Sequence, residues 1–126
     1  VGHEWGHHIQ NITGYMDRYP NNGTGPGSNG VRIELQADCY AGAWLGRMTE
    51  QTDADGDPYL IAPTEQQRED ALNAASAVGD DSIQAQSGFS NPESWAHGSS
   101  TQRQRWVRRG LPERTGSLRA GSDPSR

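Results

Sequence analysis

The chain has 126 residues, of which 31% are hydrophobic, and its formal net charge is −5 at pH 7. That length suits one domain, but 16 glycines and 7 prolines restrict a core to the periodic segments. The negative charge argues against general nucleic-acid binding, so we expect no nucleic-acid partner. A single cysteine excludes an intramolecular disulfide, and no apolar run is long enough to cross a bilayer.

The first predicted element is a helix from about residue 2 to residue 16 or 17, and it carries a His-Glu-x-x-His motif. His3 and His7 project about 40° apart around the helix axis, so both can bind one metal ion. Glu4 projects about 60° from His7, where it could activate a water on that metal. The alternative is an amphipathic helix whose histidines are only solvated.

The same helix has an apolar stripe about 170° from His7 around the axis. Its members recur at 4-3-4 spacing and are Trp5, Ile9, Ile12 and Met16. We expect this stripe to pack against a core, so that the helix lies between the active site and the protein interior.

A second helix is predicted over about residues 31–50, and it supplies two carboxylates, Glu34 and Asp38. Zinc that keeps one position open for water needs a third protein ligand. The Glu-x-x-x-Asp pattern resembles the one with which the gluzincin class of metallopeptidases supplies that ligand. The resemblance implies that Glu34 binds the metal and that Asp38, one turn later, accepts a hydrogen bond from the second ring nitrogen of a ligand histidine.

The remaining segments alternate between loops and short helices. Residues 19–30 are rich in Gly, Asn and Pro, which favours a flexible connector over a lid. An acidic loop spans residues 52–63, and a helix over 65–78 follows a Thr64/Gln67 capping box. A last helix over 100–109 follows a Ser99/Gln102 capping box, and we expect a disordered tail over residues 112–126.

Two features near the last helix have competing interpretations. His97 could hydrogen-bond a developing oxyanion or contact substrate, or it could only brace its own loop. The arginines around Trp106 could form a nucleic-acid patch, but a solvated face that pairs with acidic neighbours is the more common case, and Asp80 and Asp81 are candidates for that pairing.

Blocks throughout the chain resemble the putative neutral zinc metallopeptidase family. They are residues 3–11, 31–44, 71–75, 79–81 and 97–106, in that order along the chain. The resemblance implies a zincin-like metallopeptidase whose C-terminal part is residues 1–111, mainly helical here, with the β-sheet of an α+β domain lying upstream. It also implies that the full-length protein is anchored in a membrane by an N-terminal segment.

The sequence therefore predicts a neutral metallopeptidase with one Zn²⁺ ion bound by His3, His7 and Glu34. Glu4 would be the general base, Asp38 would orient a ligand histidine, and the substrate would be a peptide or protein. The alternative function is a zinc-binding but non-catalytic module of a membrane-associated assembly.

Overall fold

The computed structural model describes residues 1–112, and this part of the chain is helical without a β-strand. The helices are α1 (Gly2–Ile12), α2 (Tyr15–Arg18), α3 (Asn29–Glu50), α4 (Glu65–Ala77), α5 (Asp80–Gln86) and α6 (Ser100–Gly110), with a 3₁₀ turn at Pro92–Ser94. The predicted mainly helical class is confirmed for these residues. The β-sheet expected upstream of them stays a prediction.

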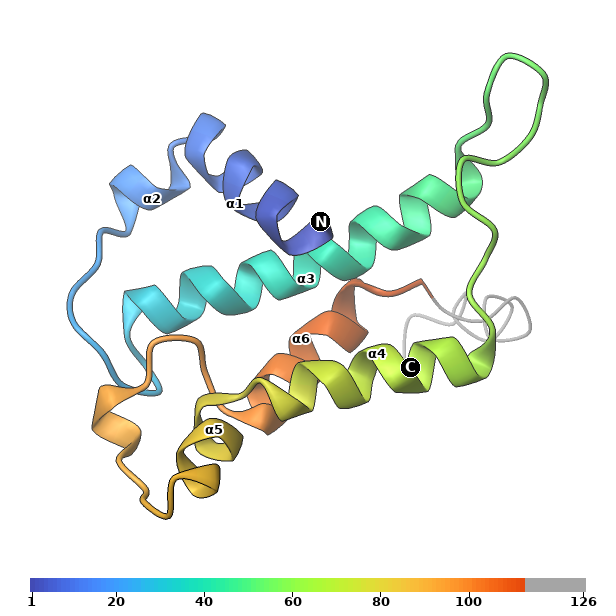
Figure 1. Ribbon diagram of the computed structural model, residues 1–126. Helices are drawn as coiled ribbons and strands as arrows, with labels where there is room; N and C mark the ends of the chain where they lie inside the picture. The colour runs from blue at the N-terminus through green and yellow to red at the C-terminus, as the bar shows by residue number, and fades with distance from the viewer. Residues whose placement is uncertain (113–126) are drawn as a thin grey trace, which may run out of the picture.

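Helix α3 is the centre of the fold. Figure 1 shows α1 crossing one side of α3, α6 lying against the other side, and α4 beside α6. The buried apolar side chains come from α3, α4 and the end of α6, and they are Val31, Leu35, Ala37, Leu72 and Leu111. This is a small core, which agrees with the low hydrophobic fraction.

Glycines let two helices approach α3 closely. A Cβ atom on Gly6 of α1 would lie 3.0 Å from the Cα of Ala37, and one on Gly110 of α6 would lie 1.9 Å from the carbonyl oxygen of Cys39. A larger residue at Gly110 would force α6 away from α3, and one at Gly6 would require α1 or its neighbours to shift by a few tenths of an ångström. The glycines thus bring α1 and α6 within backbone contact of α3.

The first helix is shorter than predicted. It ends at Ile12, because Gly14 adopts a positive φ of 73° and stops the helical path. A separate short helix, α2, then follows at an angle to α1, as Figure 1 shows. The expected continuous helix to residue 16 or 17 is therefore wrong.

The expected burial of the apolar stripe on α1 is also wrong within the described residues. Trp5 is 49% exposed and Ile12 is 63% exposed. Helix α1 packs on α3 through a different stripe, Gly2, Gly6 and Gln10, whose small or polar residues face Ala37 and Ala41 or form hydrogen bonds with α3. Close helix approach at the glycines decides which side of α1 faces inward.

Both predicted capping boxes are present, with Thr64 and Gln67 starting α4 and Ser99 and Gln102 starting α6. Helix α5 was not predicted. Of the expected disordered tail, only Pro112 belongs to the described residues, and it packs against Gly46. Across residues 1–112, no helix has the length and apolarity needed to span a membrane.

Candidate metal centre

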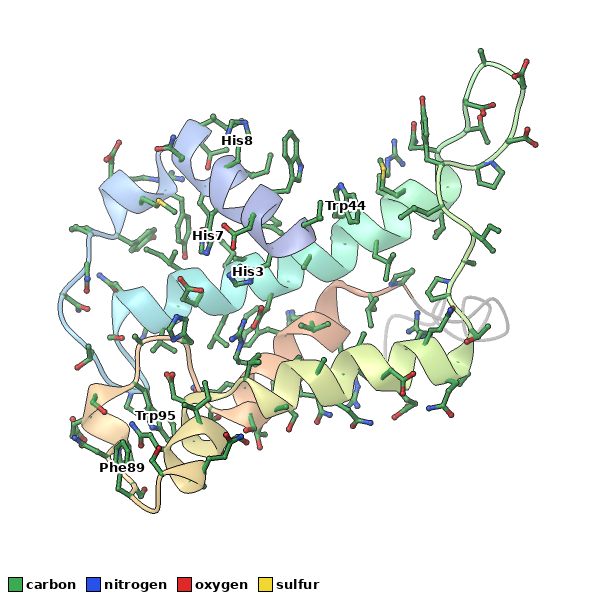
Figure 2. All side chains as sticks on the ribbon, viewed as in Figure 1. His3, His7, His8, Trp44, Phe89 and Trp95 are labelled. Atoms are coloured by element: carbon green, nitrogen blue, oxygen red, sulfur yellow. The ribbon has the colours of Figure 1, made fainter. Side chains whose placement is uncertain are left out.

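Three side chains from α1 and α3 converge in one cluster. The Nε2 atom of His3 lies 3.1 Å from Oε2 of Glu34, and the Nε2 atom of His7 lies 3.4 Å from Oε1 of the same carboxylate. One potential ligand atom from each of the three residues lies within 4.8 Å of the other two. His3 and His7 lie between α1 and α3, whereas His8 lies on the far side of α1 (Figure 2).

The cluster fits the requirements of a zinc site. Ligand atoms about 2.1 Å from a tetrahedral zinc lie about 3.4 Å from one another. The two Nε2 atoms approach the Glu34 carboxylate at 3.1 and 3.4 Å, each at a different oxygen. Two imidazoles and a carboxylate are also a donor set that zinc accepts while keeping a fourth position open. His3, His7 and Glu34 could therefore hold one zinc ion.

The second ring nitrogen of His3 is held by Asp38 on α3. The Nδ1 atom of His3 lies 2.9 Å from Oδ1 of Asp38, which is 3% exposed. Hydrogen bonds with Asp38 and then with Glu34 raise the pKa of His3 to about 9. Two carboxylates thus favour positive charge around His3, whether a proton or a metal ion supplies it.

Asp38 is held in turn by Arg103 of α6, a contact that the sequence analysis missed. The guanidinium donates from Nε and NH2 to the two carboxylate oxygens of Asp38, both at 2.9 Å, and from NH1 to the carbonyl of Val78. Burial would raise the pKa of Asp38, but the hydrogen bonds from His3 and Arg103 outweigh it and keep the pKa below its usual value. The suggested pairing of this arginine with Asp80 or Asp81 is wrong.

The contact between Gln10 and His7 was not predicted either, although the position of Gln10 on the helix indicates it. It lies about 20° from His3 around α1, on the ligand-bearing face. Its side chain is completely buried and hydrogen-bonds to His7 at 2.9 Å. A polar residue aligned with His3 and His7 is thus a candidate for a contact with one of them.

Glu4 is exposed and lies one residue after His3 on α1. Among residues 1–112, no group forms a hydrogen bond or an ion pair with its carboxylate. Within these residues the carboxylate is therefore not held in place by another side chain.

A cleft of about 400 Å³ opens beside the cluster. Its walls come from α1, α2, α3 and two loops, and they are His7, Met16, Asn21, Gly23, Thr24, Gly30, Ile33, Glu34, Ala96 and His97. The loop over residues 19–30 is more than the simple connector that was favoured, because it forms one wall of this cleft. It is also tied to the opposite segment, where Gly25 N–H donates to the Trp95 carbonyl and the Thr24 hydroxyl donates to that of Glu93.

His97 lines the same cleft as His7, and Asp80 holds it there. One Asp80 oxygen accepts the backbone N–H groups of Ala96, His97 and Gly98 at 2.7 to 3.0 Å, and the other lies 3.3 Å from Nδ1 of His97. Burial would raise the pKa of Asp80, but the hydrogen bonds from His97 and Gly98 outweigh it and lower the pKa. The start of α5 thereby fixes the loop that carries His97.

Replacing Asp80 with asparagine should lower the free energy of unfolding by about 1–2 kcal/mol near neutral pH, because a charged acceptor of three N–H groups is lost. Since folding lowers the pKa of Asp80, its contribution is fully present above the unfolded-state pKa of about 3.9 and is lost as the pH falls through the lower folded-state value. Urea unfolding at several pH values measures this. A difference from wild type that persists unchanged at pH 2 would contradict the assignment.

Comparison with known proteins gives three findings. The family model described as putative neutral zinc metallopeptidase matches residues 1–120. The chain is 50% identical over 108 residues to the uncharacterized protein Rv2575 of Mycobacterium tuberculosis, covering 84% of this chain and 37% of that protein. It is 42% identical over 118 residues to the uncharacterized protein YpfJ of Escherichia coli, covering 88% of this chain and 38% of that protein. The chain thus spans a little over a third of these relatives, and no solved structure matches it.

Proposed function

The chain belongs to the putative neutral zinc metallopeptidase family, and from this premise we propose that the cluster of His3, His7 and Glu34 binds one zinc ion and that the site hydrolyses peptide bonds. The observation that carries the proposal is the approach of both Nε2 atoms to one carboxylate, at 3.1 and 3.4 Å. The substrate would be a peptide or protein that enters the cleft beside the cluster.

Zinc in such a site would polarise a substrate carbonyl and lower the pKa of a water in its open position toward neutrality. Glu4 accepts a proton from the attacking water at its carboxylate and delivers it to the amine nitrogen as the carbon–nitrogen bond breaks. Asp38 accepts a hydrogen bond from Nδ1–H of His3 and keeps Nε2 directed at the site.

His97 is proposed to donate a hydrogen bond to the carbonyl oxygen as negative charge develops there. Its place on the cleft with His7 and Glu34 supports this role. In its imidazolium form, Nδ1 donates to Asp80 and Nε2–H remains for the substrate.

Replacing His97 with alanine should lower kcat by about 10- to 100-fold and leave zinc affinity unchanged. Removing an oxyanion donor that is shielded from water typically lowers kcat about 100- to 1000-fold. We expect a smaller fall in kcat here because the His97 side chain is 53% exposed. Steady-state kinetics and zinc titration measure the two quantities. The matched control is His8→Ala, which removes an exposed imidazole on the far side of α1. An unchanged kcat in His97→Ala would exclude the role.

Zinc stoichiometry measured together with a peptide-library digest tests the function. We expect one zinc ion per chain, cleavage that a chelator abolishes, and recovery on adding zinc. Because the chain spans only part of its relatives, the assay uses residues 1–126 and any longer natural form of the protein. Absence of zinc binding would refute the metal site. Zinc binding without cleavage in every form would favour a non-catalytic module of a membrane-associated assembly.

A further inference from the structure

Gln10 is an unusual residue for the inside of a small helical protein. It is completely buried, and together with Val31 it is the largest fully buried side chain among the described residues. A buried amide must find partners for its two N–H groups and its oxygen, because water cannot reach it there. Its partners therefore determine what the residue does.

All of these groups have partners, and the partners fix the orientation of the amide. Nε2 lies 2.8 Å from the backbone carbonyl of Ile33 and 2.9 Å from Oε1 of Gln36. A carbonyl oxygen can only accept, so the atom that faces Ile33 must be the nitrogen. The amide oxygen is then the atom that faces Nδ1 of His7, at 2.9 Å.

This orientation determines the tautomer of His7. An amide oxygen can only accept a hydrogen bond, so Nδ1 of His7 must carry the hydrogen that it donates. In the neutral ring, Nε2 then bears a free lone pair, and this atom lies 3.4 Å from Oε1 of Glu34. The lone pair is thus presented to the cluster, as metal ligation requires.

Gln10 also links the two helices of the site. Its nitrogen is bonded to the carbonyl of Ile33, the residue directly before Glu34, while its oxygen is bonded to His7. One rigid amide therefore spans α1 and α3 beside the cluster.

We propose that Gln10 is a positioning residue for His7, which holds the ring in the Nδ1–H form and directs its Nε2 lone pair at the ion. The proposal rests on the proposed function for the identity of that ion. The two histidines are then held differently, His3 by the charged Asp38 and Arg103 pair and His7 by a neutral, buried amide.

The tautomer of His7 is measured without metal by two-bond ¹H–¹⁵N correlation spectra of the metal-free protein, at a pH where the ring is neutral. Glu34 alone would favour a hydrogen on Nε2, so a hydrogen on Nδ1 reports the action of Gln10. Wild type should show the Nδ1–H form, and Gln10→Met should lose it. The wild-type spectrum tests the proposal by itself: finding His7 in the Nε2–H form in wild-type protein would overturn it.

Two further variants separate positioning from simple packing. Gln10→Glu keeps an oxygen that accepts from His7 but loses the donors to Ile33 and Gln36. Gln36→Met removes one acceptor of the Gln10 amide and leaves its bonds to His7 and Ile33. Both should retain the Nδ1–H form. Circular dichroism of each variant confirms that the helices are intact before spectra are compared.

Zinc titration provides the second measurement. We expect Gln10→Met to weaken zinc binding about 10- to 100-fold, Gln10→Glu to recover most of that loss, and Gln36→Met to stay within about twofold of wild type. Equal losses in Gln10→Met and Gln10→Glu would make Gln10 a packing residue and overturn the proposal. Absence of zinc binding by wild type, with the Nδ1–H form present, would instead refute the zinc site of the proposed function.

Discussion

Replacing Glu4 with glutamine should reduce the rate of peptide hydrolysis by at least about 100-fold, and up to about 10,000-fold, which is the range that a general base contributes. The glutamine amide has nearly the shape of the carboxylate but cannot take a proton from water. Zinc content should not change, because Glu4 is outside the group of potential ligand atoms, which comes from His3, His7 and Glu34. The variant would then separate metal binding from catalysis.

The measurement is a peptide-cleavage time course on protein whose zinc content has been determined. The matched control is Glu69→Gln, which removes an exposed glutamate from α4 and should leave both quantities unchanged. Wild-type cleavage by a zinc-loaded Glu4→Gln protein would exclude Glu4 as the base. A parallel loss of zinc and activity would instead give Glu4 a part in metal binding.

The residues of the cluster could be predicted because their relationship is local. His3 and His7 share a face of α1 through helical spacing alone, and Glu34 and Asp38 are one turn apart on α3. The chain then needs only to bring two helices together, and the glycine on α1 at the crossing allows it. Spacing within each helix therefore carried part of the prediction, and the resemblance to the gluzincin class connected Glu34 and Asp38 to the two histidines of α1.

Contacts between distant segments could not be predicted in this way. Arg103 and Asp38 are 65 residues apart in sequence, and their contact depends on how α6 crosses α3. Nothing in the spacing of the arginines around Trp106 distinguishes Arg103, which lies against α3, from Arg105, which is exposed. Which group a charged residue contacts therefore depends on how the two helices cross.

The apolar stripe of α1 shows a different limit. Amphipathic spacing indicates which side of a helix favours burial, but it does not say what covers that side. The stripe containing Trp5 and Ile12 was expected to face a core. Within residues 1–112, however, Trp5 is about half exposed and Ile12 is more exposed still. Contact through Gly6 and Gln10 instead turns the ligand face of α1 toward α3.

Replacing Arg103 with methionine should lower the free energy of unfolding by about 3–5 kcal/mol, the usual loss when one partner of a buried ion pair is removed. The Asp38 side chain is 5% exposed and that of Arg103 is 12% exposed, so water would solvate the remaining carboxylate poorly. The substitution removes two charge-assisted hydrogen bonds and leaves the carbonyl of Val78 without its arginine donor. Methionine keeps much of the volume, so the effect would come from the lost charge and donors.

Urea unfolding of Arg103→Met measures the loss, and Arg105→Met is the matched control. Arg105 is exposed on the same helix, so its replacement should change the free energy of unfolding by less than about 0.5 kcal/mol. In Asp38→Asn the carboxylate charge is already absent, so adding Arg103→Met there should cost less than it costs in wild type. Equal losses in the two backgrounds would mean that Arg103 stabilises α6 independently of Asp38.

Because Arg103 fixes the position of Asp38, which in turn holds His3, zinc affinity should change in Arg103→Met and not in Arg105→Met.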